Sequence, residues 1–147
     1  MTFTLPAYDQ IPNVGLYLEQ VTKYLNDYLE PLGCAPLTGS MIANYVKKGL
    51  VRNPIKKQYD REHIASLLVI AVSKTVLSLE ETAQLLRTCP EGQQSYDLFC
   101  TAFLSVLETV FTRGAMASMG QSLLEDTLTA VACKLYLDKQ FREAASC

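Results

Sequence analysis

No run of apolar residues in this sequence is long enough to cross a bilayer. The most apolar stretch, residues 64–72, is about half the roughly 18 residues that a membrane-spanning helix needs. Residues 1–6 contain no basic segment that leads into an apolar one, so no secretory signal is predicted. We therefore expect a cytoplasmic protein that does not enter a membrane, with residues 64–72 as a buried element.

The sequence also lacks the groupings that carry metals or catalysis. Its five cysteines are odd in number, and no two have the two-residue spacing of a zinc or thioredoxin-type motif, which indicates reduced thiols. His63 is the only histidine and has no cysteine nearby to share a metal. Because no Ser-His-Asp set and no phosphate-binding glycine loop is present, we predict no enzyme, no cofactor and no metal.

What the sequence does contain is helical periodicity. Hydrophobic residues make up 49% of the 147 residues, as in an ordinary globular domain, and they recur at spacings of three and four. A strand over residues 67–72 is the weaker alternative, because the helical spacing continues on both sides. Residues that cap a first helical turn predict where helices begin: Asn13, Thr38 or Ser40, Asp60, Ser78 with Glu81, and Ser122 with Glu125.

Between the second and third expected helices, the sequence pattern changes. Residues 50–59 carry β-branched and aromatic side chains around an Asn53-Pro54 turn signal, which predicts a two-stranded ribbon. The expected fold class is therefore all-α, mainly helical, with a small two-stranded β wing. Its expected parts are an irregular arm at 1–15, a winged helix-turn-helix at 16–88 and a C-terminal helical half at 91–147.

Positive charge is concentrated in one short segment. The chain has a net charge of −2, yet residues 47–61 contain six basic residues and one acid, a local net charge of +5. The rest of the chain therefore carries −7. A solvated charged face usually mixes both signs, so this segment favours an acidic partner.

A short helix followed by a basic ribbon is suited to duplex DNA. The helix can lie in the major groove while the ribbon contacts the flanking phosphates. Tyr45 and Tyr59 have packing in the core as an alternative to phosphate contact. The candidate DNA-binding residues are Thr38, Ser40, Asn44, Tyr45, Lys47, Lys48, Arg52, Lys56, Lys57 and Tyr59.

Residues 42–86 resemble a known family. A tyrosine precedes Gly49-Leu50, a Lys57-Gln-Tyr59 segment closes the expected wing, and Ser78-Leu-Glu-Glu opens the next helix. This pattern is similar to the MerR-type winged helix-turn-helix, and residues 38–87 would form that module. The chain also resembles an uncharacterised bacterial family of short proteins that joins such a module to a helical C-terminal half. Ala43 and Lys57 depart from the pattern, because the family usually places arginines at these positions.

Two functions remain open at this point. One is a transcriptional regulator that binds double-stranded DNA as a homodimer formed through the C-terminal helices; the other is a protein-interaction module that does not bind DNA. An aromatic stripe in the C-terminal half could line a pocket for a small-molecule effector of unknown identity, or pack between helices: Tyr96, Phe99, Phe103 and Phe111. The first function requires Arg52, Lys56 and Lys57 to join the second helix in one positive surface.

Overall fold

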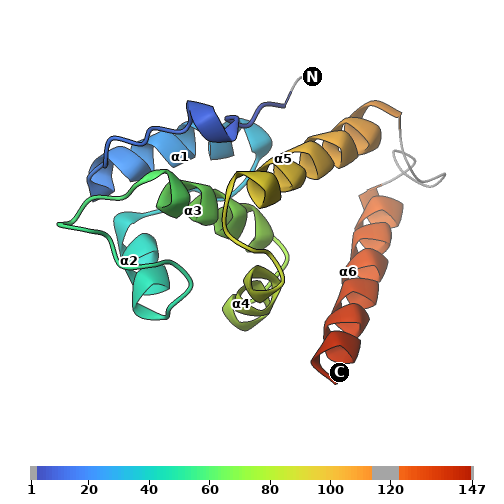
Figure 1. Ribbon diagram of the computed structural model, residues 1–147. Coiled ribbons are helices and arrows are strands. Elements are labelled where there is room, and N and C mark those ends of the chain that lie inside the picture. The colour runs from blue at the N-terminus through green and yellow to red at the C-terminus, as the bar shows by residue number, and fades with distance from the viewer. Residues whose placement is uncertain (1–2, 114–122, 147) are drawn as a thin grey trace. The chain divides into compact units, whose positions relative to one another are not determined.

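The computed structural model describes residues 3–113 and 123–146, and these residues form six α-helices (Figure 1). The all-helical part of the expected fold is confirmed. The described chain falls into two compact units: one is Phe3–Leu104, and the other begins at Ser105, inside the fifth helix. The helices are α1 (Leu18–Leu32), α2 (Gly39–Lys47), α3 (Arg61–Ser73), α4 (Leu79–Arg87), α5 (Gln93–Glu108) and α6 (Leu123–Ala145).

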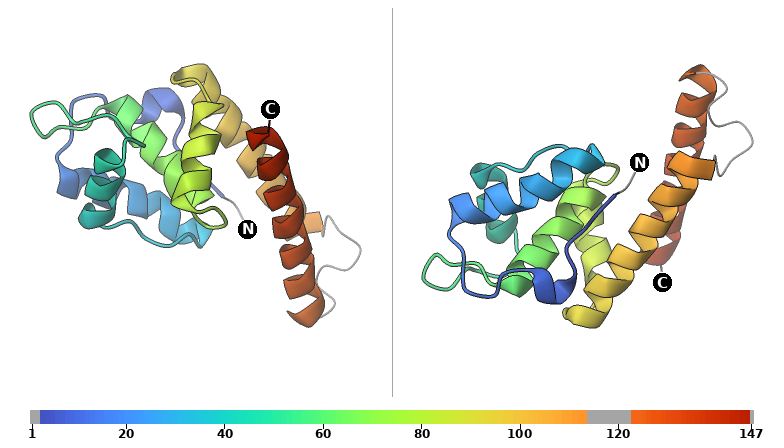
Figure 2. Two further views of the ribbon diagram at one scale, coloured as in Figure 1. Left: turned by 90° about the horizontal axis from the view of Figure 1, so that it is seen from below. Right: turned by 90° about the horizontal axis from the view of Figure 1, so that it is seen from above.

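In the Phe3–Leu104 unit, α3 is the central helix, with α1, α2 and α4 around it (Figures 1 and 2). Eight of its thirteen residues are buried, so it is apolar on nearly every side. The residues 67–72 are helical, and the strand alternative is wrong. Helix α1 contributes one apolar face to the same core, as its spacing predicts: Val21, Leu25 and Leu29.

Three of the predicted helix caps are confirmed. The Thr38 hydroxyl accepts a hydrogen bond from the Met41 backbone N–H at 3.1 Å. Asp60 and Ser78 cap α3 and α4 in the same way. The prediction for Asn13 is wrong: α1 begins at Leu18. The predicted box at Ser122 lies outside the described residues.

The predicted β wing is wrong. Among the described residues there is no β-strand. Within residues 50–59, only Ile55 and Gln58 form a β-bridge with each other. Beyond that pair, the next hydrogen-bonded pair of an antiparallel ladder would join Asn53 to Asp60. The ladder does not extend because the His63 ring takes both groups: its Nε2 lies 3.2 Å from the Asn53 carbonyl oxygen, and its Nδ1 lies 2.9 Å from the Asp60 backbone nitrogen. We call residues 48–59 the basic loop.

The expected irregular arm is packed against the unit. Ile11 is buried in the core, and the Tyr96 hydroxyl donates a hydrogen bond of 2.8 Å to the Pro6 carbonyl oxygen. Burial raises the pKa of Tyr96, so this hydroxyl stays protonated. Gly15 has a φ of +78°, and a Cβ there would come within 2.7 Å of the Gln58 amide oxygen. Glycine thus lets the arm approach the basic loop.

The second unit contains the end of α5, a π-helical turn at Thr109–Arg113, and α6. Helix α6 exposes several large apolar side chains, among them Leu124, Leu128, Leu135 and Tyr136. Among the helices that the structure describes, none has both the length and the apolar character needed to cross a membrane.

Candidate nucleic-acid interface

Helix α2 presents a polar face to solvent. Thr38, Ser40 and Lys47 are exposed, and Asn44 is half-buried. Ile42 and Tyr45, on the opposite face, are fully buried and fix the rotation of the helix on the core. The short polar side chains that could contact base edges therefore lie on the solvent side of α2.

The basic loop ends in a tight turn that projects from the unit at the same end as α2 (Figures 1 and 2). Lys56 and Lys57 occupy the two central positions, with φ values of 52° and 65°. Ile55 and Gln58 exchange two backbone hydrogen bonds of 3.1 and 2.9 Å across the turn. Two successive positive φ values characterise the type I′ turn, whose twist suits a two-residue hairpin connection. Both lysine side chains are exposed at its tip.

Two contacts hold the base of the basic loop in place. The His63 ring is only 2% exposed, and its Nδ1 accepts a hydrogen bond of 2.9 Å from the Asp60 backbone N–H. The same Nδ1 lies 2.8 Å from an Asp60 carboxylate oxygen, and the Nε2 lies 3.2 Å from the Asn53 carbonyl oxygen. Tyr59 and Leu16 exchange backbone hydrogen bonds of 2.9 and 2.7 Å on the other side. The turn is therefore anchored on both sides, at Asn53 and at Tyr59.

Arg52 is already paired with acids. Its guanidinium lies 3.8 Å from an Asp60 carboxylate oxygen and 3.5 Å from a Glu91 carboxylate oxygen. Partial burial by itself would raise the pKa of Asp60, but the hydrogen bond from the His63 backbone N–H, the adjacent His63 ring and the charge of Arg52 lower it. Arg52 is half-exposed, so its charge is partly compensated and partly available.

Arg61, the sixth basic residue of the segment, serves the fold. Its Nε donates to the Ile11 carbonyl oxygen at 2.9 Å and its terminal nitrogen donates to the Asp9 carbonyl oxygen at 3.2 Å. The guanidinium also lies over the Tyr8 ring, 5.4 Å from its centre. Desolvation and the hydrogen bond to Glu62 raise the pKa of Tyr8 to about 12.

Two of the predicted site residues are buried. Tyr45 is 1% and Tyr59 is 5% exposed. The Tyr45 hydroxyl accepts a hydrogen bond of 2.9 Å from the Lys74 ammonium group, and the Tyr59 ring packs edge-on against His63. These contacts favour the packing interpretation over contact with phosphate.

The structure thus brings together most of the predicted site. Thr38, Ser40, Lys47 and Lys48 belong to α2 and its ends, and Lys56 and Lys57 lie at the tip of the adjoining loop. None of these four lysines makes an ion pair within residues 3–113 and 123–146.

Sequence reasoning set His63 aside and missed its part in holding the loop. The available signal was its position, three residues after the cap residue Asp60, where a side chain can reach back to the cap's N–H. Within the described chain, no three metal-binding side chains come together.

Comparisons with curated proteins and with solved structures gave no match. One family model matches, described as a domain of unknown function (DUF1836), and it covers residues 6–107. That range contains every residue of the candidate interface. Because the match spans more than half of the chain, this protein belongs to the DUF1836 family.

Proposed function

We propose that this protein is a transcriptional regulator that binds duplex DNA, with α2 in the major groove and the basic loop on the flanking backbone. The observation that carries the proposal is the set of four exposed lysines without ion-pair partners in the described chain, all in or beside α2 and the basic loop: Lys47, Lys48, Lys56 and Lys57. An unpaired, exposed ammonium group gains most from a polyanion, because it has no protein partner to give up.

The helix arrangement supports the same proposal. Helix α1 packs on α2, and the two are joined by residues 33–38, as in a helix-turn-helix. Thr38 and Ser40 lie at the start of α2, which is the part of a recognition helix that contacts base edges. The resemblance of residues 42–86 to the MerR-type module points in this direction as well, without the strands of a wing. Such a regulator would act in the cytoplasm.

The lysines at the turn are suited to phosphates more than to bases. An ammonium group at the tip of an anchored loop acts as a point charge and carries no planar fork for a base edge. Sequence preference would therefore come from Ser40, Asn44 and Lys47 on α2, and affinity from Lys56 and Lys57.

Fluorescence anisotropy with a labelled mixed-sequence duplex, titrated at several salt concentrations, tests the proposal. The wild-type affinity should fall with salt at a log–log slope of about −0.9 for each phosphate contact. Lys56→Glu/Lys57→Glu should weaken binding at least about tenfold and make the slope shallower by about 2, one for each lost contact.

Lys23→Glu/Lys139→Glu is the matched control. It changes net charge by the same amount, and it alters exposed lysines on α1 and α6 that already pair with neighbouring acids. This control should keep most of the affinity. If both double variants lose the same affinity, net charge alone explains the loss and the lysines at the turn have no specific role. If the wild type does not bind the duplex even at low salt, the proposal is wrong.

The pairing of Arg52 favours a second candidate, a protein-interaction module that does not bind DNA. Its guanidinium is bound to Asp60 and Glu91, and Ala43, at the position of a usual family arginine, is exposed. In this case the four lysines would meet an acidic surface on another protein. The anisotropy experiment separates the two candidates, because only the first predicts salt-dependent binding to DNA alone.

We further propose that two copies pair through α6. Leu124, Leu128 and Leu135 share a helical spacing and are between 56% and 67% exposed. Sedimentation should give a dimer for the wild type and a monomer for Leu128→Glu/Leu135→Glu, with Gln140→Glu as a control that stays dimeric. A monomeric wild type at tens of micromolar would contradict the pairing.

A further inference from the structure

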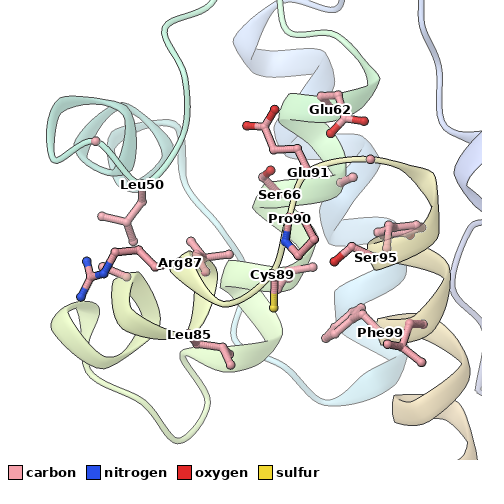
Figure 3. Close-up of a pocket in the computed structure, with 18 of the residues that line it drawn as sticks. Leu50, Glu62, Ser66, Leu85, Arg87, Cys89, Pro90, Glu91, Ser95 and Phe99 are labelled. Carbon is pink, nitrogen blue, oxygen red and sulfur yellow. The ribbon is translucent and has the colours of Figure 1, made fainter. Parts of the chain in front are cut away.

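A groove of about 570 Å³ lies within the Phe3–Leu104 unit, between α3, α4 and the first part of α5 (Figure 3). Its volume is within the range of about 300–1,000 Å³ that is usual for small-molecule sites. The candidate interface uses only Lys48 of its lining residues.

Most of the groove's wall is apolar. Val69 of α3, Leu86 of α4, and Leu98 and Phe99 of α5 contribute large side chains, and Pro90 lies in the connection between α4 and α5. Figure 3 shows Phe99 on one side, Leu50 and Arg87 on the other, and Cys89 and Pro90 between them. Arg87 and Phe99 therefore lie on opposite sides of the groove.

Four charged side chains line the groove, and they differ in what they already bind. Glu62 accepts a hydrogen bond from the Tyr8 hydroxyl, and Glu91 pairs with Arg52. Arg87 and Lys48 make no ion pair within the part of the chain that the structure describes. Both basic groups are therefore available to a ligand, and of the two acids only Glu91 is neutralised by a cation, because the Tyr8 hydroxyl that binds Glu62 is uncharged.

We propose that this groove binds a small molecule with an apolar body and a carboxylate group. The apolar body lies along Val69, Leu86 and Phe99, where it removes their apolar surface from water. The carboxylate meets Arg87, whose planar guanidinium can donate two parallel hydrogen bonds, with the Lys48 ammonium group as a second positive charge. Among the described residues, the groove thus offers two uncompensated positive charges against one uncompensated negative charge, on Glu62.

The groove also borders the proposed interface. Glu91 lines it and at the same time holds Arg52 of the basic loop. A ligand that displaces the Glu91 carboxylate would leave the Arg52 guanidinium paired with Asp60 alone. That consequence depends on the proposed function, whereas binding in the groove does not.

Cysteine alkylation tests binding without DNA, because the groove contains a reporter. Cys89 is exposed and lines the cavity, and Cys133 is exposed on α6 and serves as the internal control. The probe is decanoate, below its micelle concentration, with decylamine as the cation of equal length. Decanoate should slow N-ethylmaleimide modification of Cys89 about fivefold, and should leave Cys133 unchanged.

Two variants localise the effect. Arg87→Glu should abolish protection by decanoate, since it reverses the charge that meets the carboxylate. Ala102→Phe should fill the groove and abolish protection too. Thr101→Phe is its control, because Thr101 is the preceding residue of α5, is also exposed and does not line the groove; this variant should retain protection. Protection by decylamine equal to that by decanoate would overturn the proposal, as would no protection of Cys89 by decanoate or full protection in Arg87→Glu.

Discussion

The arginines and the lysines of residues 47–61 have different surroundings. Arg61 donates to two carbonyl oxygens of the N-terminal arm and lies over Tyr8, and Arg52 is paired with Asp60 and Glu91. Lys56 and Lys57 sit at the tip of the basic loop and Lys47 lies on the open face of α2. The two arginines therefore hold the unit together, and the lysines remain on its surface.

This difference shows that a positive segment in a sequence is not the same as a positive surface. The planar fork of arginine suits the fixed carbonyl and carboxylate acceptors that a fold supplies, whereas a flexible lysine remains solvated. Of the six basic residues that sequence counting groups together, the structure leaves four without a partner among the described residues. The following three changes test whether that separation holds.

The largest effect on stability is expected for Arg61→Ala. It removes two charge-assisted hydrogen bonds to Ile11 and Asp9 and the contact with Tyr8, so the free energy of unfolding should fall by about 2 kcal/mol. Urea denaturation measures this. Lys47→Ala, on the exposed face of α2, should stay within about 0.5 kcal/mol of the wild type. Equal costs for the two substitutions would remove the distinction between arginines and lysines.

A smaller effect is expected for Asp60→Ala, which removes the cap of α3 and an acidic partner of Arg52. The loss near neutral pH should be about 1 kcal/mol. Because the pKa of Asp60 is lowered in the folded protein, its contribution is complete above the ordinary value of about 4 and disappears as the pH falls through the folded-state value.

Unfolding measured between pH 7 and pH 3 checks this sign. The gap between the wild type and Asp60→Ala should narrow toward the acidic end. Asp60→Asn is the control, since asparagine keeps a cap acceptor without the charge. A gap between wild type and Asp60→Ala that widens toward low pH would contradict the assignment.

The smallest effect is expected at the turn itself. Lys56→Asn/Lys57→Gly places the preferred type I′ residues where both φ values are positive, and should raise stability by about 0.5 kcal/mol. Lys56→Gln/Lys57→Gln removes the same two charges and should give no such gain. If both variants raise stability equally, charge repulsion between the lysines is responsible, and not backbone conformation.

Local chemistry made the helices predictable. Thr38, Asp60 and Ser78 are caps because a short side-chain oxygen reaches an N–H only three residues away, and that spacing is visible in the sequence. The buried face of α1 follows from periodicity in the same way, whereas α3 is buried on nearly every side and has no single apolar face.

The error at residues 50–59 came from contacts that are distant in the sequence. A longer ribbon would need Asn53 to pair with Asp60, but the His63 ring of α3 binds the backbone of both, and Tyr59 pairs on its outer edge with Leu16 in the segment before α1. Arg61 counted as part of the positive segment because its acceptors lie about fifty residues earlier in the chain, out of reach of a local charge count. Periodicity and turn signals carry no information about such partners, and charge counting cannot distinguish a bound guanidinium from a free one.

The hydrogen bond from Tyr96 to Pro6 spans 90 residues of the chain. Closing so long a segment costs conformational entropy, and the cost is recovered only when Tyr96 is also buried against the arm. The start of the arm, at Pro6, can therefore bind Tyr96 only after the intervening helices have assembled, although Arg61 can hold Asp9 and Ile11 before that. A newly made chain of this protein would complete its first unit only once α5 has been synthesised.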